Sequence, residues 1–148
     1  MDKLSRLIGE KRKRKISFTL LVIGCISIIL AFSIGISDNP PGILLCYLGI
    51  ISLILIFSHH WSETKKFNIL LLCSIIGFPV SVVLHNLLYG LGKMFAANPL
   101  LSQMFESLHV SFFIIAILIC PPGILIGAAG SLVLHIQKKK IKEIQSEV

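Results

Sequence analysis

Four stretches of this 148-residue chain contain no Asp, Glu, Lys or Arg, and they constrain its fold more than any other feature. They cover residues 16–36, 42–58, 67–91 and 110–136. A helix needs roughly 17–25 mostly apolar residues to cross a bilayer core of about 30 Å, so each stretch is long enough to span a membrane. Spanning strands would alternate apolar and polar residues, whereas these stretches are apolar on every face. The sequence therefore predicts an all-α integral membrane protein with four transmembrane helices.

The basic residues indicate how the helices are threaded. Of the 14 Lys and Arg, 13 lie before residue 16, in the pair at 65–66 or in the run at 138–142, and Lys93 is the exception. With four spans these 13 positions share one side of the membrane, and the positive-inside rule assigns that side to the cytoplasm. We therefore predict a multi-pass protein of the cell membrane with both termini in the cytoplasm.

This threading divides the chain into three parts. Residues 1–15 form a basic cytoplasmic segment, residues 16–136 a four-helix transmembrane domain and residues 137–148 a basic cytoplasmic tail. The apolar core of a cleaved signal peptide is roughly 7–15 residues long, so the longer first stretch is expected to remain as a helix. The spans themselves are predicted at about 16–36, 42–58, 67–91 and 108–136.

The same charges indicate the partners of the chain. Basic segments beside membrane spans attract anionic headgroups by roughly 1 kcal/mol per charge. The expected partner is therefore a lipid bilayer with anionic headgroups at its cytoplasmic face. No nucleic acid is expected as a partner, because the membrane topology already accounts for where the charges lie.

The pentapeptide PPGIL occurs twice, at residues 40–44 and 121–125, in different surroundings. The first copy follows polar residues and predicts a tight turn between the first and second helices. A turn at the second copy, inside an apolar stretch, would leave backbone groups unsatisfied in lipid at several kcal/mol each. We therefore expect Pro121 and Pro122 to kink the fourth helix and Pro79 to kink the third.

These prolines also free backbone acceptors. Proline has no N–H, so Pro79 frees the carbonyl of Ile75 and Pro121 frees that of Ile117. Broken helices at one depth form midplane sites in transporters, although proline kinks are also common in membrane helices without that role.

Gly123, Gly127 and Gly130 lie among Ala and Ser in the second half of the fourth span. Small residues let helix backbones approach closely in lipid. We predict that this face packs against another helix. The partner is either internal, for example the second helix through Gly42 and Gly49, or lies in another subunit.

The most suggestive polar residues lie at the non-cytoplasmic ends of the third and fourth spans. They are His85, Asn86 and Tyr89 in the third span, and Glu106 and His109 at the entrance to the fourth. Glu106 and His109 share a helix face, as in bundle metal sites, and His85 could supply a third ligand. Ionisable residues inside a membrane are functional candidates by default. A structural hydrogen-bonded cap is nevertheless favoured over metal or haem ligation.

Enzymatic motifs are missing from the sequence. The four cysteines, one in each apolar stretch, have no CxxC or CxH spacing, and no phosphate-binding loop, nucleophile elbow or HExxH is present. The sequence implies no cofactor and leans away from an enzyme. The leading hypothesis is a non-enzymatic packing or complex-forming subunit, as a homo-oligomer or in a larger membrane complex. The alternatives are a small transporter or channel, and a metal- or haem-binding redox subunit.

Overall fold

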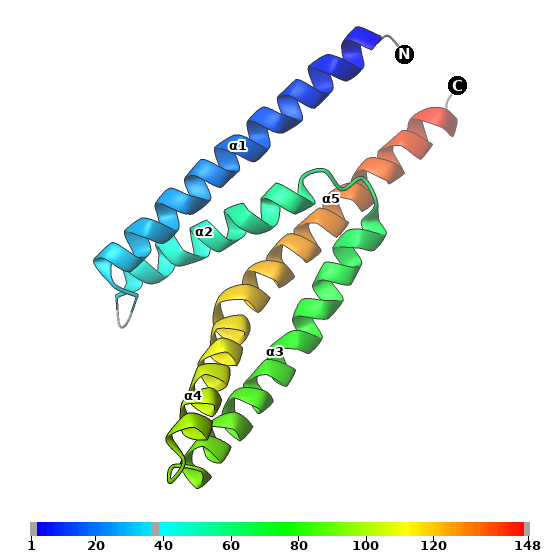
Figure 1. The fold of residues 1–148 in the computed structure, drawn as a ribbon. Helices are drawn as coiled ribbons and strands as arrows, with labels where there is room; N and C mark the ends of the chain where they lie inside the picture. Colours follow the sequence, from blue (N-terminus) through cyan, green and yellow to red (C-terminus); the bar gives the residue numbers. More distant parts are fainter. Residues whose placement is uncertain (1–2, 37–38, 147–148) are drawn as a thin grey trace.

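All the elements of the structure are helical. This computed structural model describes residues 3–36 and 39–146, with side chains of the first helix from Glu10 onward. The predicted turn at the first PPGIL includes residues 37 and 38, which lie outside the described residues. The elements are α1 (Lys3–Ile34), α2 (Pro40–Ser58), α3 (Thr64–Met94), α4 (Pro99–Ile114), the π-helical segment η1 (Ile115–Ile119) and α5 (Cys120–Ser146) (Figure 1).

Four helical rods are long and apolar enough to cross a membrane. They are α1, α2, α3 and the continuous run Pro99–Ser146 formed by α4, η1 and α5. This confirms the predicted all-α architecture with four such helices. All four rods extend beyond the predicted spans. α2 begins two residues early, at Pro40, and in the other three rods Lys, Arg and Glu, which are good helix formers, continue the helical hydrogen bonding past the apolar residues. The fourth rod begins at Asn98, whose side chain accepts a hydrogen bond from Leu101 N at 3.3 Å.

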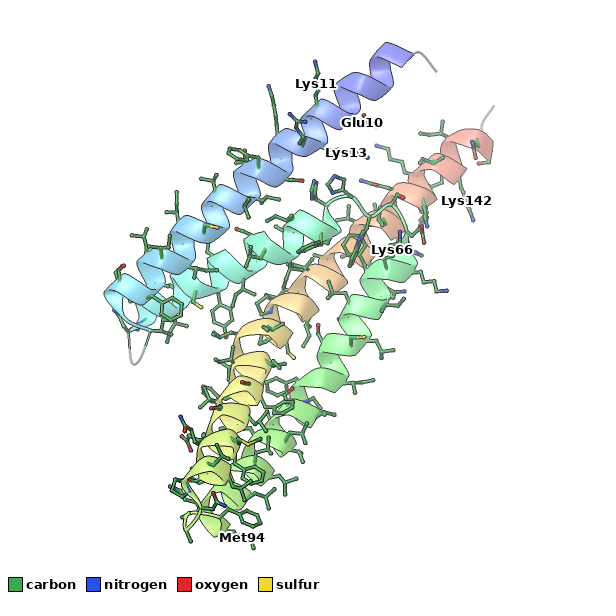
Figure 2. The ribbon with its side chains drawn as sticks, viewed as in Figure 1. Glu10, Lys11, Lys13, Lys66, Met94 and Lys142 are labelled. Atoms are coloured by element: carbon green, nitrogen blue, oxygen red, sulfur yellow. The ribbon has the colours of Figure 1, made fainter. Side chains whose placement is uncertain are left out.

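The helices form two hairpins. One consists of α1 and α2, and the other of α3 packed against α4, η1 and α5 (Figure 1). The hairpins meet where α2 lies against α5 and η1, and they diverge toward the connections after α1 and after α3 (Figure 1). Lys11, Lys66 and Lys142 mark one end of the molecule, which we call the basic end, whereas Met94 lies at the opposite end (Figure 2).

Small residues form the contact between α1 and α2. Gly24 lies against Gly49, where an added Cβ would stand 3.2 Å from Gly24 O. Near the turn, Gly42 lies directly against the Gly35 carbonyl. Gly35 itself has a φ of 94°, a left-handed conformation that glycine adopts without steric cost. The first PPGIL therefore opens α2 with two prolines in its first turn and closes the hairpin with its glycine.

Candidate functional site

The structure brings four of the five predicted polar residues together at the end opposite the basic end. His85 and Tyr89 of α3 face His109 of α4, with ring centroids 5.1 Å and 5.5 Å from that of His109. Glu106 lies one turn before His109 on α4, and its Oε2 is 3.6 Å from His109 Nδ1. Asn86 does not join them, because its Nδ2 donates to Val82 O on its own helix at 2.9 Å.

One hydrogen bond in this polar cluster links the two helices. His85 Nδ1 lies 2.9 Å from the backbone oxygen of His109. A carbonyl oxygen only accepts, so His85 Nδ1 carries the proton and donates it. This bond joins α3 to α4 near their shared connection.

His109 is the less satisfied member of the cluster. It is 8% exposed, and its Nδ1 has no hydrogen-bond partner among the described residues. The Glu106 carboxylate, at 3.6 Å, lies just beyond hydrogen-bond distance and is largely exposed. A small approach of Glu106 would bring its carboxylate within hydrogen-bond distance of His109 Nδ1.

The same residues were the predicted metal ligands. Within residues 3–36 and 39–146, no group of three or more His, Cys, Asp or Glu is placed to hold a metal ion. His85, Glu106 and His109 therefore lie near one another without forming a ligand shell. The cysteines, Cys25, Cys46, Cys73 and Cys120, are all free thiols.

The prolines of the second PPGIL lie at a break in the helical hydrogen bonding. In η1 the pattern widens, with Cys120 N–H bonded to Ile115 O five residues earlier. Pro121 follows at once and cannot bond Ile117 O. The hydroxyl of Tyr47, on α2, donates to Ile117 O at 2.7 Å instead. The carbonyl that the proline frees is thus satisfied by a side chain from the other hairpin.

Tyr47 was missed by the sequence analysis. The signal was present, because Tyr47 is the one tyrosine in an otherwise apolar stretch and a buried tyrosine hydroxyl usually requires a partner. Pro79, in contrast, lies inside α3, which continues as a helix on both sides of it. Nearby, a Cβ added to Gly77 would stand 3.5 Å from Cys120 Sγ, so the two proline regions lie at a similar level.

The predicted glycine face of α5 packs within the chain. Gly123 lies against Ser74 and Gly130 against the ring of Phe67, while a Cβ added to Gly127 would stand 2.8 Å from Leu71 N. The partner is therefore α3. The second helix, named above as an example of an internal partner, instead uses Gly49 against α1 and Gly42 against Gly35, which follows α1.

A cavity of about 490 Å³ at the basic end was not anticipated from the sequence. It lies between the hairpins, lined by residues of α2, the connection after it, α3 and α5. No local pattern reveals it, because its walls come from segments far apart in the chain. The molecule thus offers a polar cap at one end, close helix contacts along its length and a cavity at the other end. No protein-family model matches the chain, and no curated protein or solved structure is significantly similar to it.

Proposed function

We propose that the chain is a non-enzymatic, complex-forming membrane subunit whose two hairpins accommodate a further transmembrane helix. The observation that carries this proposal is the divergence of the hairpins at the end opposite the basic end (Figure 1). Each hairpin is closed internally by small residues, whereas the two meet mainly through α2 with α5 and η1 within the described residues. This further helix is supplied by another copy of the chain or by a larger membrane complex.

The face of α2 that meets the second hairpin supports this proposal. Leu55, Ile51, Tyr47 and Leu44 follow one another at helical spacing and share a face. The first two line the cavity and Tyr47 bonds η1. Leu44 continues the face past the point of divergence, where it is 68% exposed. Leu44 thus belongs to a helix-packing face but is exposed, and it marks the place where a partner helix would dock.

Photo-crosslinking from position 44 tests the proposal. A photoreactive amino acid there should yield adducts that contain a second protein chain. Two differently tagged copies distinguish a homo-oligomer from a larger complex. Phe32, on α1, is 71% exposed and serves as the control, because it is not part of the α2 face that meets the second hairpin. Lipid adducts alone from position 44, as from position 32, would remove the proposal.

We also propose that the basic end lies in the cytoplasm and that the third and fourth helices bend at their prolines. The first proposal is supported by the gathering of Lys11, Lys66 and Lys142 at one end (Figure 2), as the positive-inside rule requires. The second is supported by η1 and by the bond from Tyr47 to Ile117 O.

A small transporter or channel is the second candidate function. The favouring observation is the buried Nδ1 of His109, which faces Glu106 and lacks a hydrogen-bond partner in the described part of the chain. Ionisable groups at such positions mark ion pathways. His109→Ala should therefore abolish proton uptake into liposomes that contain the protein, whereas Asn86→Ala should not. Absence of uptake by the unaltered protein would exclude proton transport.

A further inference from the structure

The cavity at the basic end has the size and the walls of a ligand site. Its volume of about 490 Å³ falls within the roughly 300–1,000 Å³ that small-molecule sites occupy. α2 and α5 contribute most of the wall, and Phe67 of α3 contributes an aromatic ring. The wall is mainly aliphatic, formed by Ile51, Leu55, Leu125, Ile126, Val133 and Leu134.

Ser58 places an unsatisfied hydroxyl on this wall. Ser58 is 1% exposed, and its Oγ has no hydrogen-bond partner among the residues that the structure describes. Ser52, earlier on the same helix, shows the usual arrangement, because its hydroxyl donates to Leu48 O at 2.8 Å. A buried hydroxyl without a partner is unfavourable, and the cavity is the place from which a partner can come.

Polar and basic residues border the cavity. Trp61 and Gln137 also line it, together with His59, and tryptophan favours the membrane–water interface. Lys138 follows Gln137 and holds its ammonium 3.2 Å from Thr64 Oγ1 at the start of α3. Lys66 lies at the same end (Figure 2), but its ammonium is paired with the Glu63 carboxylate at 3.3 Å. The cavity is therefore apolar along its wall, and the Lys138 ammonium supplies positive charge at its border.

We propose that this cavity binds a phospholipid with an anionic headgroup. One acyl chain lies along the aliphatic wall between α2 and α5. The phosphate accepts the hydrogen bond that Ser58 Oγ lacks and lies beside the Lys138 ammonium. A water-soluble anion would match the polar border and leave the aliphatic wall uncovered, whereas a phospholipid matches both. The bound lipid also joins the two hairpins at the end where they meet.

Native mass spectrometry of the full-length protein released from detergent micelles tests this site. The probes are phosphatidylglycerol, phosphatidylcholine and inorganic phosphate. We expect one phosphatidylglycerol per chain, held about tenfold more tightly than phosphatidylcholine because of the adjacent Lys138, and no phosphate adduct. Ser58→Ala should weaken phosphatidylglycerol binding several-fold. Ala129→Trp, which places an indole in the cavity, should abolish the binding of both lipids.

Two further variants complete the design. Ser52→Ala is the matched control, because this buried serine bonds its own helix and does not line the cavity. Lys138→Gln alters an exposed side chain, and should lower the preference for phosphatidylglycerol while phosphatidylcholine binding stays the same. Circular dichroism checks that each variant is helical. If Ala129→Trp does not fold, Ser58→Ala and Lys138→Gln decide whether the proposal holds. Equal binding of the two lipids, or unchanged binding in Ser58→Ala and Lys138→Gln, would overturn the proposal.

Discussion

Ser74, Leu71 and Phe67 of α3 lie successively against three glycines of α5, and these pairs show what a small residue contributes in a membrane. Lipid tails are as apolar as the side chains, so helices associate through close contact rather than through burial from water. The glycine spacing predicted a packing face. It could not predict α3 as the partner, because that choice depends on how the helices pair across the whole chain.

Gly127→Ala tests the closest of these backbone contacts. The added Cβ would stand 2.8 Å from Leu71 N and 2.9 Å from Leu71 Cα, which are backbone atoms that cannot turn away. We expect the substitution to lower the free energy of unfolding by about 1–3 kcal/mol, as overpacking does elsewhere. The measurement is an SDS-induced unfolding titration in mixed micelles.

Gly90→Ala in α3 is the matched control. A Cβ added at Gly90 meets nothing within 4 Å among the described residues. Replacing a helical glycine by alanine then stabilises the helix by about 0.5–1 kcal/mol. The two substitutions should therefore have opposite signs, and a stabilising Gly127→Ala would show that the α3–α5 contact is looser than described.

Among the elements, the four spanning helices could be predicted from the sequence and η1 could not. Stretches without charge leave few other structures in a bilayer, because every backbone group must find its partner within the helix. The π-helical hydrogen bonding over residues 115–119 depends in addition on which group donates a hydrogen bond to Ile117 O. That partner, Tyr47, lies on another helix, and the sequence indicates only that a carbonyl is free.

A double-mutant cycle tests the link between Tyr47 and Pro121. Tyr47→Phe keeps the ring and removes the hydroxyl, which should cost about 0.6–1.7 kcal/mol, as found for hydrogen bonds between membrane helices. Pro121→Ala restores an N–H that can bond Ile117 O within the helix. Tyr47→Phe should then cost little in the Pro121→Ala background. A coupling energy of zero between the two substitutions would mean that the Tyr47 hydroxyl does not replace the hydrogen bond that Pro121 removes from Ile117 O.

At the scale of the whole molecule, the direction in which the chain crosses the membrane is easier to predict from the sequence than the packing of one hairpin against the other. Charges at the ends of spans bias orientation by themselves, so the sequence alone supports a prediction of which end lies in the cytoplasm. The position of one hairpin against the other depends instead on a few distant pairs, such as Tyr47 and Ile117. The cavity follows from that position, as does the lack of a hydrogen-bond partner for Ser58 Oγ among the described residues. Neither could be predicted from the sequence, for the same reason.

The orientation itself has a direct test. A fluorescent protein that matures only in the cytoplasm should be bright when it is fused after Val148. Fused after residue 97, between α3 and α4, it should stay dark, because that connection lies at the end opposite the basic end. The reverse pattern would invert the proposed topology.

The divergence of the hairpins also makes the molecule responsive to membrane thickness. α2 has 19 residues and is about 28 Å long, close to a bilayer core, whereas α3 has 31 residues and is about 46 Å long. In a thin bilayer the longer helix must tilt further than the shorter one. Tyr47 lies where the two hairpins meet. The tilt of α3 would therefore rotate its hairpin about that contact and change the distance between the diverging ends of the two hairpins. We therefore expect bilayers of short and long acyl chains to set different separations between the connection after α1 and the connection after α3, measurable by spin-label distances.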